Sequence, residues 1–504
     1  MKLATIYTRA LTGIHAPQVS VEVHISNGLP ALSIVGLPEA AVRESKDRVR
    51  AAIINSHFEF PTRKITINLA PADLPKDGGR YDLPIALGIL AASEQMALDQ
   101  FEHYEFHGEL ALSGALRKVN GSLPVALACK QANRQLILPP ENANEAALVE
   151  GVQVLSADSL LSVCQHLKGL NTLPVADVST VINHIDRQLP DMADVRGQHH
   201  ARRALEIAAA GRHNMLMVGP PGTGKSMLAS RLASILPPMT EQQALESASI
   251  CSISHQGFDI SQWKTRPFRN PHHTASGVAL VGGGSKPTPG EISLAHQGVL
   301  FLDELTEYDR HVLDVLREPM ETGRISISRA SRQADFPARF QLIAAMNPCP
   351  QGYACNDKDL CQCSYNQQKK HRSKISAPFL DRIDMHVEVP RIDKNALDSH
   401  SPKGENSEII RERVRQAYQR QLSRSPHCNA ELSVSEIETF CALQAPQKAL
   451  LNKAMDKLKL SARAYHRILK LARTIADIDN SDNIEIPHIS EAISYRSLDR
   501  FFNA

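Results

Sequence analysis

The residues best suited to carry out chemistry are the eight from Gly219 to Ser226, which read Gly-Pro-Pro-Gly-Thr-Gly-Lys-Ser. This G-x4-G-K-S pattern follows an apolar stretch, 215–218, and precedes a run of helical character. Glycines allow successive backbone amides to converge on phosphate oxygens at a helix N-terminus. Lys225 is expected to reach the β- and γ-phosphates, and the Ser226 hydroxyl to ligate Mg²⁺. The residues predicted to hold a nucleotide are Gly219, Pro220, Pro221, Gly222, Thr223, Gly224, Lys225 and Ser226.

Two further apolar stretches end in polar residues suited to the same chemistry. The stretch 298–302 ends at Asp303 and Glu304. Asp303 is the expected Mg²⁺ partner, and Glu304 the expected base that orients an attacking water. The stretch 340–346 ends at Asn347, which could hydrogen-bond that water or the γ-phosphate. The alternative for Asn347 is an ordinary turn residue at the end of a strand.

The elements that must position these residues follow from the alternation of apolar runs, Gly-rich turns and helical runs. Over 191–397 this alternation indicates an α/β core with a parallel sheet. Residues 1–167 mix short β-like and helical runs, which predicts a separate α/β domain, and 168–190 loses periodicity as a linker would. Residues 398–504 are predicted to form a domain of amphipathic helices.

Composition and charge place the chain among ordinary globular proteins. It has 504 residues, 42% hydrophobic and 22% charged, with a formal net charge of +2, so a polyanion site must come from local clustering. The N-terminal residues lack an apolar signal-peptide core, and the most apolar window, 81–98, is interrupted by acids and a proline. Nine cysteines, an odd number, indicate a reducing compartment. We therefore expect a cytoplasmic protein without a membrane segment.

The three strand-end motifs together resemble those of AAA+ ATPases. The segment Asp194-Val-Arg-Gly197-Gln198 is similar to the adenine-contacting segment of that superfamily, which makes Gly197 and Gln198 further candidates for cofactor binding. The run 266–305, RPFRNPHHTASGVALVGGGSKPTPGEISLAHQGVLFLDEL, is similar to the magnesium-chelatase-like branch, and the similarity covers essentially the whole chain. The resemblance implies an ATPase that uses ATP and Mg²⁺ and carries a helical lid after its core.

By the same resemblance the protein works as a ring, commonly a homo-hexamer, in which a neighbour completes each active site. The segment 377–384, APFLDRID, stands where the family carries its arginine finger, so Arg382 is the candidate. The alternative is a surface arginine paired with one of the adjacent aspartates. In the lid, Arg463 matches the sensor-2 arginine best, and Arg467, one turn later, is the second choice.

The N-terminal domain resembles the proteolytic domain of Lon over 71–86 and 107–139. Lon-type proteases use a serine that a lysine activates, but here Arg80 stands at the position of the serine and Leu123 at that of the lysine. Proteolysis is therefore not expected, because both the nucleophile and its base are missing. The domain could instead present a basic binding face, or a merely solvated one, made of Lys76, Arg80, Arg117 and Lys118.

Four cysteines follow the Asn347 stretch within 15 residues: Cys349, Cys355, Cys361 and Cys363. Four thiolates could hold a structural Zn²⁺ tetrahedrally. The C-x5-C-x5-C-x-C spacing is not a common zinc-binding spacing, and Gln351 stands where many members of the resembled family have a second cysteine. A zinc site and free thiols in a loop therefore both stay open.

Local clusters of positive charge provide candidates for DNA contact. The segment 324–340 is expected to form a β-hairpin with Arg329 and Arg332 near its turn, and in the resembled family this hairpin faces the central pore. A Gly-rich insert, 266–290, resembles a second pore-facing element and carries Arg266, Arg269, His272, His273 and Lys286. Cations on flexible loops suit a phosphate backbone that is tracked without base reading. The alternative is a charged rim between subunits.

Residues and resemblance together predict a hexameric, ATP-driven motor acting on single-stranded and branched DNA without sequence preference. Branch migration of heteroduplex DNA in natural transformation is implied by the resemblance alone. Two alternatives stay open: a chelatase subunit that powers Mg²⁺ insertion into a porphyrin, and a protein-remodelling ATPase. The chelatase alternative requires a partner with a D-x-S-x-S motif, and a large N-terminal domain is not expected in that type of subunit.

Overall fold

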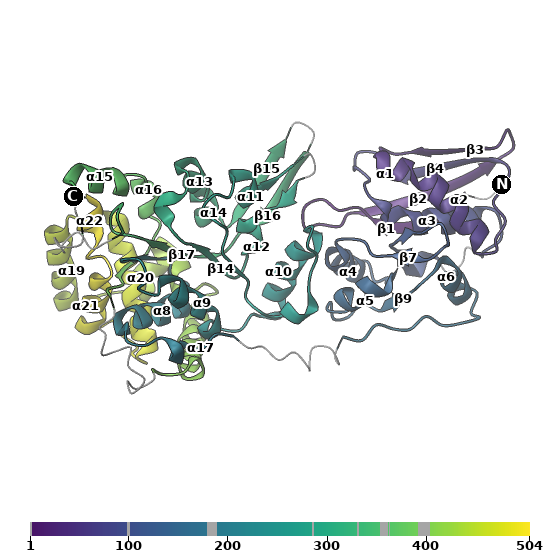
Figure 1. Ribbon diagram of the computed structural model, residues 1–504. Helices are drawn as coiled ribbons and strands as arrows, with labels where there is room; N and C mark the ends of the chain where they lie inside the picture. The colour runs from purple at the N-terminus through teal and green to yellow at the C-terminus, as the bar shows by residue number, and fades with distance from the viewer. Residues whose placement is uncertain are drawn as a thin grey trace. The chain divides into compact units, whose positions relative to one another are not determined.

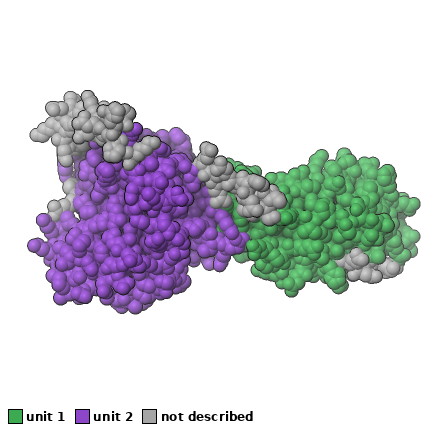
Figure 2. All heavy atoms as spheres, turned by 90° about the horizontal axis from the view of Figure 1, so that it is seen from below, with its two compact units in different colours: residues 1–186, 244–263 green, residues 187–243, 264–504 purple. Residues whose placement is uncertain are grey.

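The computed structural model describes residues 3–97, 101–178, 189–284, 287–329, 332–352, 361, 363–391 and 404–503. The chain divides into two compact units, which Figure 2 shows in different colours. Unit 1 comprises Met1–Asp186 and Ala244–Trp263, and unit 2 comprises Arg187–Gln243 and Lys264–Ala504.

Residues 244–263 lie inside the predicted core in sequence but belong to unit 1 in the structure. They include most of helix α10 (Glu241–Ile253). Ser252 on this helix accepts two hydrogen bonds from backbone amides of unit 1. Its carbonyl oxygen accepts from Gly121 at 2.9 Å, and its hydroxyl accepts from Leu123 at 3.4 Å. The two units are therefore discontinuous along the chain, which the sequence pattern alone does not reveal.

Unit 1 contains a four-stranded sheet with the strand order β1-β2-β4-β3. Its strands are β1 (Leu3–Arg9), β2 (Gln18–Ser26), β3 (Ala31–Val35) and β4 (Lys64–Ala70). Burial alternates along β2 and β4, as expected for a sheet with one face on the core. Helix α3 (Asp82–Ala92) is buried at every residue and contacts β1 and β2, so it forms the centre of this unit.

A second sheet of unit 1 has three parallel strands in the order β5-β8-β9. They are β5 (Tyr104–Phe106), β8 (Gln135–Leu138) and β9 (Val154–Ser156). Helices α4 (Ser122–Gln131) and α5 (Pro140–Ala146) connect them along the chain. Parallel strands joined through helices make this unit an α/β domain, as the sequence predicts.

Unit 2 is built on a five-stranded sheet in which every pairing is parallel, with the order β11-β14-β17-β10-β18. Figure 1 labels two of these strands, β14 and β17. The strands are β10 (Met215–Val218), β11 (Phe268–Arg269), β14 (Val299–Leu302), β17 (Gln341–Met346) and β18 (Met385–Glu388). Every residue of β10, β14 and β17 is buried, as is typical of strands covered on both faces. The predicted parallel α/β core is confirmed.

The predicted hairpin is also present. Strands β15 (Arg324–Arg329) and β16 (Arg332–Pro337) pair in antiparallel fashion, with Arg329 opposite Arg332 at the turn end. In Figure 1 the hairpin extends from the body of unit 2. The other end of the hairpin is packed into the unit, since Phe336 is buried.

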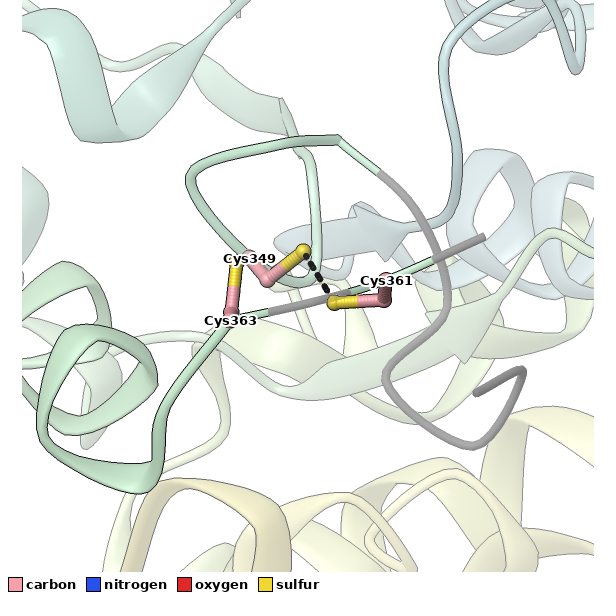
Figure 3. Close-up of side chains that lie close together, drawn as sticks. All are labelled: Cys349, Cys361 and Cys363. Atoms are coloured by element: carbon pink, nitrogen blue, oxygen red, sulfur yellow. Dashed lines mark hydrogen bonds between the residues drawn. The ribbon is translucent and has the colours of Figure 1, made fainter. Parts of the chain in front are cut away.

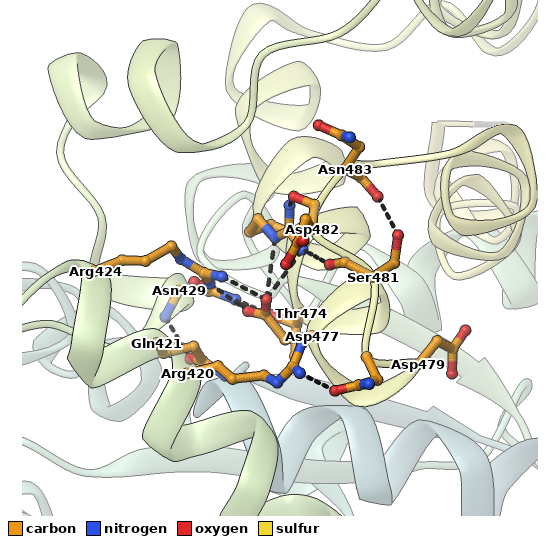
Figure 4. Close-up of polar contacts among 12 residues, drawn as sticks. Arg420, Gln421, Arg424, Asn429, Thr474, Asp477, Asp479, Ser481, Asp482 and Asn483 are labelled. Atoms are coloured by element: carbon orange, nitrogen blue, oxygen red, sulfur yellow. Dashed lines mark hydrogen bonds and ion pairs between the residues drawn. The ribbon is translucent and has the colours of Figure 1, made fainter.

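The C-terminal part of unit 2 is helical, with α17 (Ser407–Arg424), α18 (Val434–Phe440), α19 (Ala445–Leu458), α20 (Ala462–Ile478) and α21 (Ile486–Ser494). A buried polar cluster ties α17 to α20 (Figure 4). The carboxylate of Asp477 on α20 accepts hydrogen bonds from Arg424 at 2.6 Å and from Asn429 at 2.8 Å. Such a buried acid is tolerated because its charge is paired and hydrogen-bonded.

One continuous hydrophobic core joins the sheet of unit 2 to these helices. It includes Met217 on β10, Leu232 on α9 (Lys225–Ile235) and Leu471 on α20. The helices thus bury their apolar faces inside the unit. In the part of the chain that the structure describes, no helix is both long enough and apolar enough to cross a bilayer.

Candidate nucleotide site

The predicted phosphate loop connects β10 to α9 at the carboxyl edge of the parallel sheet. Gly219 lies so close to Val389 that a Cβ there would come within 2.1 Å of the Val389 carbonyl oxygen, so only glycine fits. Gly224 has a φ of 86°, which side chains rarely allow, and helix α9 begins at the next residue. The first amides of α9 are therefore placed for a phosphate, as the sequence predicts.

Lys225 is buried with its ammonium group inside the loop. Its Nζ donates to the carbonyl oxygens of Gly219 and Pro220, both at 2.8 Å, and to Oδ1 of Asn347 at 3.2 Å. Burial lowers the pKa of Lys225, and two nearby carboxylates offset this effect only in part. A phosphate bound here would supply the negative charge that this buried ammonium lacks, so the loop fits the predicted nucleotide.

Ser226 and Asp303 meet directly although they come from separate motifs. Ser226 Oγ donates to Asp303 Oδ2 at 2.5 Å. A hydroxyl and a carboxylate that face each other are oxygen ligands of the kind that Mg²⁺ prefers. The pair therefore fits the predicted ion, with Asp303 at the end of β14 and Ser226 at the start of α9.

Glu304, the candidate base, follows Asp303 at the same edge, and its backbone amide donates to Asp303 Oδ1 at 2.9 Å. Its Oε2 lies 3.1 Å from Nδ1 of His273. His273, which belongs to the predicted pore-facing insert, lies beside the candidate base in the structure. The loop that carries it is held by Tyr308, whose hydroxyl donates to the Pro271 carbonyl at 2.6 Å. Sequence reasoning missed this contact.

The candidate adenine segment lies at the same edge of the sheet. Gln198 Nε2 donates at 2.7 Å to the carbonyl oxygen of Pro390, just beyond the carboxyl end of β18. Gly197 and Gln198 both have positive φ, 61° and 50°, so the backbone turns sharply there. Asp194 accepts a hydrogen bond at 3.2 Å from Arg231 of α9, the helix that begins at the phosphate loop. These contacts fit the predicted role of Gly197 and Gln198.

A second group of charged residues lies at the opposite, amino edge of the sheet. Asn214 directly precedes β10, Asp384 directly precedes β18, and the Asn214 amide donates to Asp384 Oδ2 at 2.9 Å. Burial alone would raise the pKa of Asp384, but the charge of Arg467, contacts with His213 and the Asn214 amide outweigh it and lower the pKa. Arg467, the second sensor-2 candidate, is thus an ion-pair partner that fastens α20 to the sheet.

Arg382 and Arg463 line a cavity of about 410 Å³ at this amino edge. Arg382 pairs with Glu321 at 2.5 Å, and not with either adjacent aspartate as its alternative interpretation expected. The side chain of Arg463 is 68% exposed and lies 3.8 Å from Asp381. Among the described residues that line this cavity, none belongs to the phosphate loop or to the strand end at Asp303. The two arginines therefore lie near each other and away from the residues of the same chain that are predicted to bind the nucleotide.

Two of the five candidate DNA contacts already have partners within the chain, and one of them is buried. Arg266 is only 8% exposed, and its guanidinium donates to the carbonyl oxygens of Pro237 at 2.7 Å and Gln297 at 2.6 Å. Burial lowers the pKa of Arg266 to about 10. Arg269 forms two hydrogen bonds with Glu291, both at 2.7 Å. The prediction for Arg266 is corrected because its donors serve the interior, and the charge of Arg269 is already balanced by Glu291.

The other three DNA candidates stay predictions. The backbones of Arg329 and Arg332 face each other across the hairpin next to its turn. Lys286 lies outside the described residues. Of these three candidates, only the two on the hairpin lie in the part of the chain that the structure describes.

Three of the four predicted metal-binding cysteines come together (Figure 3). The sulfur atoms of Cys349, Cys361 and Cys363 all lie within 4.8 Å of one another, and the first two are 3.5 Å apart. Cys355 lies outside the described residues. The structure thus brings distant cysteines to one point although their spacing is unusual.

In unit 1, the positions that resemble the Lon dyad are built into the fold. Leu123 is fully buried, and burial lowers the pKa of Arg80. Lys76 is also fully buried, and its Nζ donates to a backbone carbonyl. Lys76 therefore cannot belong to a basic surface, and the suggested face reduces to the exposed Arg117 and Lys118 with part of Arg80.

Three family models match this chain. They are described as "Magnesium chelatase, subunit ChlI" for residues 191–397, "Subunit ChlI of Mg-chelatase" for 21–142, and "Magnesium chelatase, subunit ChlI C-terminal" for 404–496. The second match corrects the expectation that the N-terminal region sets the chain apart from that type of subunit.

Individual relatives narrow the assignment. The competence protein ComM of Haemophilus influenzae is 50% identical over 503 residues, 99% of this chain and 98% of that protein. YifB of Escherichia coli is 49% identical over 504 residues, also 99% and 98% of the two chains. The magnesium-chelatase 38 kDa subunit of Cereibacter sphaeroides is 27% identical over 174 residues, 30% of this chain and 51% of that protein. The chain therefore belongs to the magnesium-chelatase-like AAA+ ATPases, in the group that contains ComM and YifB.

Proposed function

We propose that this protein is a cytoplasmic, hexameric ATPase that moves single-stranded and branched DNA and drives branch migration in natural transformation and recombination. The observation that carries the proposal is the separation of two groups of residues in unit 2. Lys225 and Glu304 lie at the carboxyl edge of the sheet, while Arg382 and Arg463 lie at the amino edge. Because strand β10 spans about 13 Å between these edges, the two groups cannot serve one nucleotide in the same chain. We therefore infer that a neighbouring subunit supplies the arginines.

At the carboxyl edge the residues have the geometry for ATP hydrolysis. When bound, ATP and Mg²⁺ would supply the phosphoryl group and neutralise its developing charge. Lys225 and the first amides of α9 would bind the phosphates, and Ser226 and Asp303 would hold the ion. Glu304 would accept the proton of the attacking water. Asn347, which already contacts Lys225, would position that water.

At the amino edge, Arg382 and Arg463 would be offered together to the nucleotide of the next subunit. Arg382 would exchange Glu321 for the transferring phosphoryl group, which carries more negative charge in the transition state than a single carboxylate. Arg463 is exposed enough to reach across a subunit boundary. A closed ring satisfies every site in this way, since each subunit gives and receives one pair of arginines.

The hairpin supports the DNA part of the proposal. Arg329 and Arg332 end the paired part of a projecting hairpin, and Lys286 comes from a Gly-rich insert. Cations placed in this way contact phosphates without reading bases. ComM is named as a competence protein, which agrees with DNA as the substrate.

A second candidate, an ATPase subunit for Mg²⁺ insertion, is favoured by one observation. All three family models are described as the ChlI subunit of magnesium chelatase. Against it, the sequence match to the chelatase subunit of Cereibacter sphaeroides covers only 30% of this chain, whereas ComM matches 99%. The two candidates differ in whether DNA changes ATP turnover.

The experiment compares the triple variant Arg329→Ala, Arg332→Ala, Lys286→Ala with wild type, measuring DNA affinity against salt together with basal and DNA-stimulated turnover. We expect intact basal turnover, loss of stimulation, and a salt dependence that is flatter by roughly one unit for each phosphate that the variant no longer neutralises. A control triple variant at the exposed Lys448, Lys453 and Lys457 of α19 should behave as wild type. If ATP turnover of the wild-type protein is the same with and without DNA, the result would favour the chelatase candidate.

A further inference from the structure

The three converging cysteines belong to chain segments that the ATPase chemistry does not use. Cys349 follows strand β17 after Asn347, and Cys361 and Cys363 lie just before helix α15 (Tyr365–Arg372). Cys349 is buried, and the other two are partly exposed. Three thiols from two segments have no reason to gather for packing alone, because cysteines elsewhere in the described chain are dispersed.

The distances suit a tetrahedral metal ion. With Zn–S bonds of about 2.3 Å, two sulfurs of one tetrahedral site are about 3.8 Å apart. Here Cys349 and Cys361 are 3.5 Å apart, and the three sulfurs lie within 4.8 Å of one another. Small side-chain rotations would equalise these separations. A disulfide would use only two of the three sulfurs and would leave the convergence of the third unexplained.

The position of the cluster connects it to the phosphate loop. The turn that starts at Cys349 closes with a hydrogen bond from the Gly352 amide to the Cys349 carbonyl at 2.9 Å. This turn packs on the loop, since a Cβ at Gly352 would lie 3.1 Å from Cδ of Pro221. On the other side, His371 of α15 lies 3.1 Å from the Asn347 carbonyl oxygen. An ion that joins Cys349 to the start of α15 would therefore hold in place both the turn that follows Asn347 and the helix whose His371 contacts Asn347.

We propose that Cys349, Cys361 and Cys363 bind a zinc ion that braces Asn347 and the phosphate loop. Zinc is the metal of choice because the three donors are thiolates at separations that suit three corners of a tetrahedron, with the fourth left for another ligand. The ion has no part in the hydrolysis itself, because none of the three cysteines lies among the candidate catalytic groups. Its role is to hold the turn that contacts Pro221, so zinc and ATP should each strengthen the binding of the other.

The test measures metal content and ATP affinity on the full chain, purified without chelators from zinc-supplied cells. We expect about one zinc per wild-type chain and a large loss in Cys349→Ser, Cys361→Ser and Cys363→Ser. The matched control is Cys441→Ser, because Cys441 is as buried as Cys349 but lies outside the cluster. Titration of wild-type thiols with an organomercurial, which needs no variant to fold, should release the zinc.

Zinc near zero in the wild-type protein, an iron chromophore in its absorbance spectrum, or a Cys349–Cys361 disulfide in non-reduced peptides would overturn the site. Zinc-free protein, prepared by thiol titration and reduction, should bind ATP about fivefold or more weakly, with recovery when Zn²⁺ alone is added back. ATP affinity that is equal with and without zinc would overturn the brace. Neither measurement uses DNA, so failure here and failure of the motor proposal are distinguishable.

Discussion

The two edges of the parallel sheet in unit 2 differ in how their charged residues are held. At the carboxyl edge the carboxylate of Glu304 is half exposed and the Lys225 ammonium is satisfied by backbone carbonyls and by Asn347. At the amino edge Asp384 is buried and paired with Arg467. Arg382 and Arg463 line the cavity beside this pair.

The fold needs some of these charged residues for its stability and leaves others available for a ligand. Asp384 and Arg467 fasten a C-terminal helix to the sheet, so they are structural. Glu304 at one edge and Arg463 at the other do not fasten elements together, and each side chain is more than half exposed. Under the proposed function, a complete hydrolytic site combines the carboxyl edge of one chain with the amino edge of another.

The largest expected effect is that of Arg382→Ala. If Arg382 stabilises the transferring phosphoryl group of a neighbour, turnover should fall by about 10³–10⁵-fold with ATP affinity nearly unchanged. Glu321→Gln is the matched control, because it removes the other half of the same ion pair. Equal losses in both variants, measured by steady-state turnover, would show that the ion pair and not the free arginine matters.

At the carboxyl edge, Glu304→Gln should keep ATP bound and lower turnover by about 10²–10⁴-fold, as expected for loss of a general base. Nucleotide affinity and phosphate release measure the two properties separately. Glu307→Gln, which changes a nearby carboxylate in the same turn, should stay close to wild type. Near wild-type turnover in Glu304→Gln would remove Glu304 from the site.

The structural role of the amino edge predicts a loss of stability. Asp384→Asn leaves Arg467 without its partner and should cost about 3 kcal/mol in the free energy of unfolding of unit 2. Since the folded protein lowers the pKa of Asp384, its contribution is complete above the pKa of the unfolded chain and is lost as the pH falls further. The difference between wild type and variant in the free energy of unfolding, measured with denaturant, should therefore become smaller below about pH 4. A gap that is constant with pH would contradict the ion pair.

The smallest expected effect concerns His273 at the carboxyl edge. His273→Ala removes the group 3.1 Å from Glu304 and should lower turnover by roughly tenfold, through misplacement of the base. His273→Gln, which keeps a donor, should recover part of the rate, and His272→Ala should have little effect. A positioning role also predicts an altered pH profile of turnover in His273→Ala; an unchanged profile with full activity would exclude it.

Most residues at the carboxyl edge can be predicted from the sequence, because each motif directly follows an apolar strand. Parallel pairing of those strands then brings Ser226 to Asp303 and Lys225 to Asn347 without further information. The family and the α/β fold follow from the same segments. The hairpin, with Arg329 and Arg332 at its turn end, is likewise visible in the sequence.

Contacts between segments that lack a periodic pattern cannot be predicted from the sequence in this way. Arg266 looks like a loop cation, but its guanidinium is used by the carbonyl oxygens of Pro237 and Gln297. His273 reaches Glu304 through a loop, and the only hint in the sequence is that His273 directly follows His272 in a polar segment. The assignment of 244–263 to unit 1 follows from contacts between segments, such as the hydrogen bonds to Ser252, which no local pattern encodes.

Mixing two inactive variants tests whether each site combines the carboxyl edge of one chain with the amino edge of another. Lys225→Ala lacks a working carboxyl edge and Arg382→Ala lacks a working amino edge, so each alone should be inactive. In mixed rings, an Arg382→Ala subunit can receive an intact arginine from a Lys225→Ala neighbour, and we expect turnover to reappear in proportion to such neighbours. Mixed assembly is verified with distinguishable tags. No recovery in verified mixed rings would mean that Arg382 does not act between subunits.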